Sequence, residues 1–401
     1  MRPGKAAGLC FLGAGLLAGA ARAGVWGSQP DIGIMGDYYT NPALVNLPDS
    51  AESHADLLLD APTSYIGDGY KLTLLPSFRW TNAQGYSYLD SPYDHLSVIN
   101  EFDTGRSVTT LTTTASRDSS LYHDYLLDGS TGVRRDSELA DLTWDHHFSE
   151  RLELNVDGNW TRVLYGEASG TATLTDYKYY SLAPMLSRST SERGTLTLQA
   201  TGGRYNSING RTDSTSVALQ AGFTEQLSEL WSVTASAGDS RAKNRADVTE
   251  IFYLFGIIPV PVSETLRATQ NGSIYSITLS RQTERVNLTV VASRQLAPTG
   301  FAFLSHEDVY QIKATFLPTL RWSLSGDVHR VTYQQPAENL TGINIDLDYL
   351  DLSAAWRWTE HWTLNLSATK VMERYESSRL NLASTGASIE MSRQFDWKSL
   401  Q

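Results

Sequence analysis

The chain is almost without cysteine. Its single cysteine, Cys10, lies in an apolar N-terminal stretch, and no other follows it. This scarcity excludes disulfide frameworks, thiol catalysis, iron–sulfur clusters and covalently attached haem from the rest of the sequence. It also suits a chain that passes through an oxidising compartment, because no wrong disulfide can form there.

The sequence also lacks any apolar run long enough for a transmembrane helix. The apolar stretch from Ala6 to Ala20 is too short, and no later segment approaches about eighteen consecutive apolar residues. This stretch follows Arg2 and Lys5 and precedes Ala21-Arg22-Ala23, a small-x-small cleavage site. The pattern predicts a secretory signal peptide over residues 1–23.

Positive charge is scarce as well. The chain has 32 Lys+Arg against 44 Asp+Glu, a net charge of −12, and loss of Arg2, Lys5 and Arg22 with the signal peptide lowers it to −15. Nucleic acid is not expected as a partner, because no basic stripe is available to neutralise phosphates. Nucleotide-binding, zinc-protease and nucleophile-elbow motifs are missing too, so we expect no cofactor, no metal and no enzymatic activity.

What the sequence does contain is a recurring unit: an alternating strand, a tight Ser/Thr-Glu turn, and another alternating strand. The turns are Ser149-Glu150-Arg151, Ser228-Glu229-Leu230, Thr283-Glu284-Arg285 and Thr359-Glu360-His361. The flanking strands run about 10–14 residues, longer than soluble strands and close to the length that a tilted membrane-spanning strand needs. The unit is typical of a transmembrane β-barrel.

Alternation within the strands predicts two different faces. Leu152, Leu154 and Val156 share one face, and Glu153, Asn155 and Asp157 share the other. Hydrophobic residues make up only 41% of the chain, which fits a polar lumen inside an apolar band about 25 Å tall. We therefore predict an all-β fold, a transmembrane antiparallel up-and-down barrel. A soluble sandwich would also alternate, but with shorter strands and less unequal turns.

The barrel is expected over residues 70–401. Residues 24–69 are less regular and are expected to form two strands or a periplasmic or lumen segment. We predict strands at 70–80, 94–102, 106–116, 138–148, 151–165, 171–187, 194–206, 213–226, 231–242, 272–283, 286–296, 308–317, 320–333, 344–358, 362–374 and 380–395. This gives about sixteen strands, or eighteen if both N-terminal strands belong to the ring.

Turn lengths and aromatic residues predict the orientation in the membrane. Short turns alternate with long connections, and outer-membrane barrels place the short turns in the periplasm. Aromatic residues near the short turns include Phe148, Phe223, Trp231, Phe316, Trp322, Trp358 and Trp362, and a second set near the opposite strand ends comprises Tyr165, Tyr205, Tyr275, Tyr310, Tyr333 and Tyr375. We expect these sets to form two girdles at the membrane–water interfaces.

The last predicted strand carries a family resemblance. Ser384-Thr385-Gly386-Ala387-Ser388-Ile389-Glu390-Met391 resembles the C-terminal signal by which outer-membrane proteins are recognised for insertion, although Phe395 is followed here by six further residues. The layout resembles Gram-negative porin-like barrels, some of which accompany exopolysaccharide export systems. The resemblance implies an outer-membrane location and, as partners, outer-membrane lipid, the barrel-insertion machinery and periplasmic components of an export system.

Three groups of residues are candidates for function. Lumen-lining candidates are Asp145, Glu153, Asp157, Lys313, Asp327, His329 and Arg357. A loop containing Phe252, Phe255, Ile257 and Ile258 is unusually apolar, which favours a constriction (a gate) or a partner contact over plain lipid contact. Asp346, Asp348 and Asp351 lie near one strand end, where they could form a cation site or ring a pore mouth.

The expected function is a passive pore for hydrophilic solutes or for a secreted polymer such as exopolysaccharide. The acidic net charge favours neutral or cationic cargo. Two alternatives stay open: a plugged structural or adhesive barrel, and an outer-membrane enzyme. For the enzyme, Ser325, Asp327 and His329 share one strand face, but such neighbours are about 7 Å apart, too far for direct nucleophile–base contact.

Overall fold

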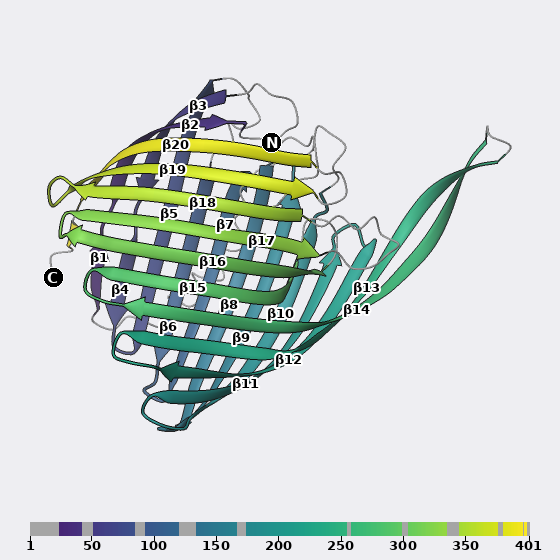
Figure 1. Ribbon diagram of the computed structural model, residues 1–401, viewed down its shortest axis with the longest axis horizontal. Helices are drawn as coiled ribbons and strands as arrows, with labels where there is room; N and C mark the ends of the chain where they lie inside the picture. Colours follow the sequence, from purple (N-terminus) through teal and green to yellow (C-terminus); the bar gives the residue numbers. More distant parts are fainter. Residues whose placement is uncertain are drawn as a thin grey trace.

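The chain folds into one closed β-barrel (Figure 1). The computed structural model describes residues 24–41, 51–84, 93–119, 134–166, 174–254, 258–298, 304–334, 345–375, 380–395 and 397–398. In these segments no helix is long and apolar enough to cross a membrane. The strands are β1 (Val25–Ser28), β2 (Asp31–Thr40), β3 (Ala51–Asp60), β4 (Thr63–Gly67), β5 (Tyr70–Gln84), β6 (Tyr93–Asp103), β7 (Ser107–Ser119), β8 (Arg134–Ser149), β9 (Leu152–Tyr165), β10 (Tyr177–Ser189), β11 (Gly194–Ser207), β12 (Thr212–Gln226), β13 (Trp231–Leu254), β14 (Ile258–Gln282), β15 (Val286–Pro298), β16 (Leu304–Thr319), β17 (Trp322–Gln334), β18 (Ile345–Arg357), β19 (Trp362–Tyr375), β20 (Leu380–Gln394) and β21 (Trp397–Lys398).

The ring has eighteen strands, so the expected count of about sixteen is wrong and the alternative of eighteen, with both N-terminal strands in the ring, is confirmed. Of the 21 strands in the sheet, all except β1, β4 and β21 pair antiparallel in chain order, and β20 closes the ring on β2. The two additional strands are β2 and β3, which come from the segment that the sequence marked as irregular. Both strands are ten residues long, but no Ser/Thr-Glu turn adjoins them, so the sequence left their place in the ring open. The pairing of β2 with β20 holds them in the ring.

Prolines interrupt the sheet at the end that carries the short turns. Because proline has no backbone N–H, it cannot donate a hydrogen bond to a strand ladder. β1 and β2 are separated at Pro30, and β3 and β4 at Pro62. The backbone N–H groups of Gln29 and Phe395 donate to the carbonyls of Pro62 and Pro30 at 3.0 and 2.7 Å, which keeps the neighbouring strands joined across these breaks.

One aromatic girdle forms as predicted, and the other forms only in part. Phe148, Phe223 and Trp322 are exposed on the outer wall near the short turns. At the opposite end, Tyr310 faces outward and its hydroxyl lies 3.1 Å from that of Tyr275, but Tyr205 is fully buried on the inner face. Tyr165 and Tyr333 share the inner face with Tyr205, because each lies an odd number of positions from an outward residue of its strand. The side chain of Tyr375 lies outside the described residues.

The β13–β14 hairpin is much longer than predicted. The two strands pair without a break from Trp231↔Arg281 to Leu254↔Ile258, whereas the sequence suggested a loop over most of residues 243–270. The hairpin leaves the ring because β14 pairs with β15 only from Tyr275 onward. Figure 1 shows the two strands projecting away from the barrel mouth.

Candidate channel lumen

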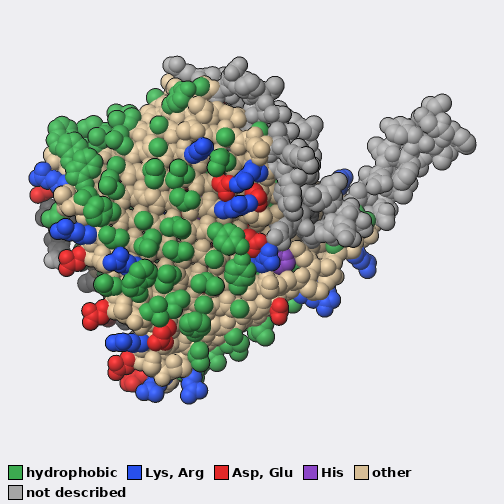
Figure 2. Space-filling model, viewed as in Figure 1, with side chains coloured by type: hydrophobic (Ala, Val, Ile, Leu, Met, Phe, Trp, Pro, Cys, Tyr) green, Lys and Arg blue, Asp and Glu red, His purple; other side chains and the backbone are tan. Residues whose placement is uncertain are grey.

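The two faces of the wall differ in chemistry, and β11 shows the difference clearly. On β11, Leu196 and Leu198 are exposed on the outer face, while Thr195, Thr197 and Gln199 alternate with them on the inner face. Figure 2 shows hydrophobic side chains spread over the outer face, with charged side chains gathered toward its edges. Such a surface is unfavourable in water, but it matches the hydrocarbon core of a bilayer.

Charge is also sorted between the faces. Within the described residues, the lumen face carries the basic residues Lys71, Arg79, Arg135, Lys313 and Arg357. It carries far more carboxylates, namely Asp31, Asp37, Glu52, Asp56, Asp60, Glu101, Asp103, Asp118, Asp141, Asp145, Glu153, Asp157, Glu307, Asp327, Asp351, Glu373 and Glu390. Most of the basic side chains are on the outer wall, so the lumen is more acidic than the net charge suggests.

In a closed ring every strand has a neighbour on both sides, so its backbone N–H and C=O groups are hydrogen-bonded. This is the condition for a sheet to span lipid. Together with the apolar outer band, the polar lumen and the aromatic row, this decides the location. The chain is a transmembrane β-barrel of the outer-membrane type. By the turn rule for such barrels, the short turns face the periplasm and the long connections face outside.

The wall formed by β8 and β9 carries most of the predicted acidic lining. Asp145, Glu153 and Asp157 all point into the lumen. Asn155 donates to Asp145 at 2.6 Å, Thr143 donates to Asp157 at 2.9 Å, and Asn159 donates to Asp141 at 2.5 Å. These neutral donors fix the carboxylates without neutralising them, so the wall keeps its negative charge.

The wall formed by β16, β17 and β18 lies on the opposite side of the barrel (Figure 1). Lys313, Asp327 and Asp351 form one row across these strands on the inner face. Asp327 accepts hydrogen bonds from Gln311 at 2.7 Å and from His329 at 3.1 Å. His329 stacks on Tyr349 with 4.3 Å between ring centroids. Arg357 has the same inward parity at the periplasmic end of β18.

Ser325 and His329 are not arranged as a nucleophile and its base. The Ser325 hydroxyl lies 2.5 Å from that of Ser353, and His329 is held by Asp327 one register step away. In the described residues there is no group of three or more His, Cys, Asp or Glu that could hold a metal ion.

The three aspartates proposed as a cation site are divided between the two faces of the wall. β18 keeps a regular register with both neighbours, so residues an odd number of positions apart point to opposite sides. Asp346 and Asp348 therefore face outward, where they pair with Arg330 and Arg374. Asp351 faces the lumen opposite Asp327, so the three carboxylates do not share one site.

A charged cluster near the outer mouth was not predicted from the sequence. Its members are Asp37 on β2, Glu52, His54 and Asp56 on β3, and Arg79 on β5, and the side chains of the three acids are fully buried. The two ring nitrogens of His54 lie 3.1 Å from Asp37 and 3.2 Å from Glu52. Arg79 donates to Asp37 at 2.9 Å and also contacts Asp56. The available signal was the period-two spacing of Glu52, His54 and Asp56.

The end of the β15–β16 hairpin bends into the lumen. Leu304, the first residue of β16, is fully buried against Val163, Tyr177 and Tyr205 of β9, β10 and β11. Along the ring, β12, β13 and β14 separate this hairpin from β11, so the contact requires the strand ends to leave the wall. We call the described ends of the hairpin, residues 295–298 and 304–308, the inward tip.

His306 of the inward tip packs against Gly272 of β14 and so fixes the tip to the wall. The Ser240 hydroxyl donates to the carbonyl of Gly272 at 3.0 Å and lies 3.3 Å from His306 Nε2, which therefore acts as donor to Ser240. A Cβ atom on Gly272 would lie 2.7 Å from the imidazole ring of His306. Glycine is required here because the histidine occupies the space that any other side chain would fill.

The residues predicted to form a gate belong to the projecting hairpin. Phe252 lies in β13 and Ile258 in β14, and their backbones extend away from the mouth; nothing is described of their side chains. Phe255 and Ile257 lie outside the described residues. The segment that packs across the inner face is instead the inward tip, and the apolar run that marks it in the sequence, Phe301 to Leu304, is shorter than the one around Phe252.

Comparison of the whole chain with known proteins gives likeness in fold only. No family model matches the chain, and no curated protein matches it in sequence. Among solved structures it is similar to a BenF-like porin from Pseudomonas fluorescens, at 10% identity over 92% of this chain and 99% of that one, with a TM-score of 0.48. It is also similar to OpdK from Pseudomonas aeruginosa, at 12% identity over 92% and 99%, with a TM-score of 0.46. The ferric citrate transporter FecA matches at 10% identity over 91% and 78%, with a TM-score of 0.48.

Proposed function

We propose that this protein is a passive channel for small hydrophilic solutes and that it prefers cationic over anionic ones. The observation that carries the proposal is the excess of carboxylates on the lumen face. Fixed negative charges along a hydrated passage attract cations and repel anions, and the low-dielectric wall strengthens both effects. Net charge alone supports this only weakly, whereas the sorting of charge between faces bears directly on the conducting path.

The geometry of the outer mouth supports small cargo. The inward tip crosses from β15–β16 to β11, and buried apolar side chains gather on the inner face at Val331, Ile345, Leu347 and Leu382. A polymer such as exopolysaccharide would need the tip to move aside. The same contacts would close the lumen in a plugged structural barrel, so conductance is the deciding measurement.

The test is the reversal potential of the purified protein in a planar bilayer under a tenfold KCl gradient. The lumen variant is Asp141→Asn, Asp145→Asn, Asp157→Asn, which keeps side-chain size and hydrogen-bond capacity. The matched control removes three carboxylates from the outer wall: Asp136→Asn, Glu138→Gln, Asp213→Asn.

We expect cation selectivity in the native protein, a several-fold lower ratio of potassium to chloride permeability in the lumen variant, and no change in the control. Anion selectivity of the native protein would overturn the proposal. Equal effects of both triple variants would assign selectivity to surface charge instead. Absence of conductance, even in variants with a loosened inward tip, would favour the plugged barrel.

A further inference from the structure

An exposed basic cluster lies on the outer wall above the apolar band of β11 to β14. Its positive members are Arg204, Arg241, Lys243, Arg245 and Arg267, and the carboxylates among them are Asp213, Asp239 and Asp247. All eight side chains have outward parity, so none of them faces the channel. The cluster therefore needs an explanation outside the transport path.

The depth of the cluster places it at the outer membrane–water interface. Arg241 lies ten positions after Trp231, the aromatic residue at the periplasmic end of the same strand face. This is about 33 Å along the strand, or about 25 Å along the membrane normal at a tilt of about 40°. That distance equals the height of the apolar band, so Arg241 begins the headgroup layer of the outer leaflet.

Ion pairing within the cluster leaves part of its positive charge unmatched. Arg204 pairs with Asp213 at 3.0 Å, and Arg245 with Asp247 at 3.5 Å. A hydrogen bond from Thr265 lowers the pKa of Asp247 further, so this carboxylate is ionised at neutral pH. Arg241, Lys243 and Arg267 make no ion pair with any other described residue.

The strand register adds a repulsive contact that an anion would relieve. Arg245 and Arg267 are directly opposite each other on β13 and β14. Like charges at opposite positions of an antiparallel pair destabilise the pairing. Lys243 lies diagonally from Arg267 and about 7 Å from Arg241, so long side chains from all three positions can reach a common point.

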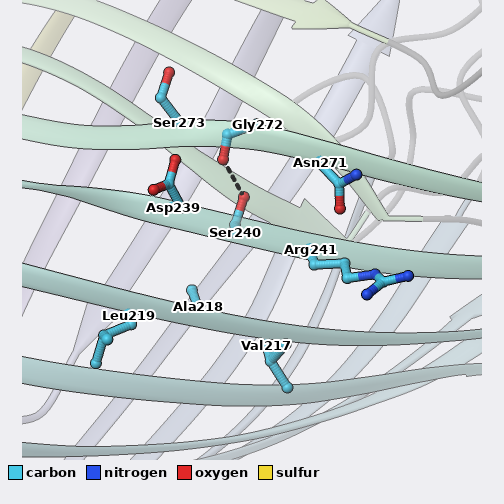
Figure 3. A pocket seen from close by; sticks show the side chains of 9 residues that line it. All are labelled: Val217, Ala218, Leu219, Asp239, Ser240, Arg241, Asn271, Gly272 and Ser273. Atoms are coloured by element: carbon cyan, nitrogen blue, oxygen red, sulfur yellow. Dashed lines mark hydrogen bonds between the residues drawn. The ribbon is translucent and has the colours of Figure 1, made fainter.

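A groove just below the cluster offers a complementary apolar surface (Figure 3). It encloses about 580 Å³ and is lined on its apolar side by Val217 and Leu219, with Arg241 and Asn271 at its upper edge. Val217 and Leu219 are 62% and 58% exposed. Val217 lies directly opposite Arg241, and Leu219 lies opposite Asp239, two residues closer to the periplasmic end. The groove thus places an apolar floor directly beside cationic and amide donors.

We propose that this surface binds a phosphorylated, multiply acylated lipid of the outer leaflet. The phosphate group lies among Arg241, Lys243 and Arg267, and an acyl chain packs along Val217 and Leu219. Asp239, at the lower edge of the groove, faces the polar linkage of the lipid rather than its phosphate. Charge-assisted hydrogen bonds from guanidinium groups suit phosphate oxygens, which favours this ligand over a neutral lipid.

The experiment measures binding of bisphosphorylated lipid A to the folded barrel in a neutral detergent by native mass spectrometry. The variant is Arg241→Gln, Lys243→Gln, Arg267→Gln. The matched control, Arg188→Gln, Arg281→Gln, Arg393→Gln, removes the same charge from the outer wall at the periplasmic end. A monophosphoryl lipid A and the same lipid without phosphate serve as further probes.

We expect the variant to lose about tenfold in affinity, the control to keep native affinity, and affinity to fall as phosphates are removed. Equal losses in both variants, or equal binding of the lipid without phosphate, would overturn the proposal. Inorganic phosphate that competes at millimolar concentration would assign the site to free anions instead. If the triple variant does not fold, the single variants Arg241→Gln and Arg267→Gln are expected to lose about threefold each.

Discussion

The most direct test of the lumen structure is to loosen the inward tip at Leu304. This side chain is fully buried against Val163, Tyr177 and Tyr205. Replacing a fully buried leucine with alanine costs about 2–5 kcal/mol, and the lower part of that range applies where the site can relax. About 3 kcal/mol corresponds to a population of detached tips about 150-fold larger than in the native protein.

The assay is single-channel recording in a planar bilayer. If the tip obstructs the lumen, Leu304→Ala should increase the time spent at the highest conductance level by about two orders of magnitude, until that level dominates. Ser240→Ala removes the hydroxyl that accepts a hydrogen bond from His306. It should weaken the attachment of the tip by about 1 kcal/mol and raise the same population about fivefold. The two variants should therefore rank in this order.

The chain offers a matched control at Leu320. This leucine is 98% exposed in the periplasmic turn between β16 and β17, so Leu320→Ala removes the same atoms without a packing loss. Unchanged conductance in Leu304→Ala would refute the view that the tip obstructs the path. An equal change in Leu320→Ala would show that the effect does not arise from the tip contact.

Further predictions concern stability, followed by the temperature at which the folded barrel unfolds on a heated gel. Arg79→Ala leaves Asp56 buried without its cation and Asp37 with His54 alone, and should cost about 3–5 kcal/mol. Arg117→Ala, whose partner Asp136 lies on the exposed outer wall, should cost less than about 1 kcal/mol. Equal losses would contradict the burial argument. Gly386→Ala places a Cβ atom 2.3 Å from the ring of Tyr39 and should cost about 1–3 kcal/mol. Gly202→Ala, with open space at the same atom, should be close to neutral, and a stable Gly386→Ala barrel would show that Tyr39 moves aside without cost.

The sequence determined the fold class because a membrane-spanning strand must satisfy a local rule. Each strand alternates between lipid and water, as Leu196 and Thr197 do on β11, and this pattern is visible without knowledge of any partner strand. The periplasmic turns also carry a local signal, since Ser228 and Thr283 accept backbone N–H groups two or three residues later in the chain. Inward or outward parity along regular strands, including Asp145 and Asp327, follows from the same period.

Other properties depended on contacts between residues far apart in the chain. The eighteenth strand pair joins β2 to β20, and its hydrogen bonds give no local signal in residues 31–40. Asp346 and Asp348 face outward and Asp351 faces the lumen only because β18 is regular between them. A single bulge in that stretch would have placed all three carboxylates on one face. The mouth cluster around His54 required three neighbouring strands in register.

The position of the inward tip against the inner wall was decided by tertiary structure alone. The sequence directed attention to the apolar residues near Phe252, because an apolar loop is expected to seek a buried surface. The continuous pairing of β13 with β14 carries that segment away from the mouth, while the unremarkable end of β15–β16 turns inward to Leu304. Hydrophobicity reports how strongly a segment avoids water, but only the surrounding strands determine which surface it reaches.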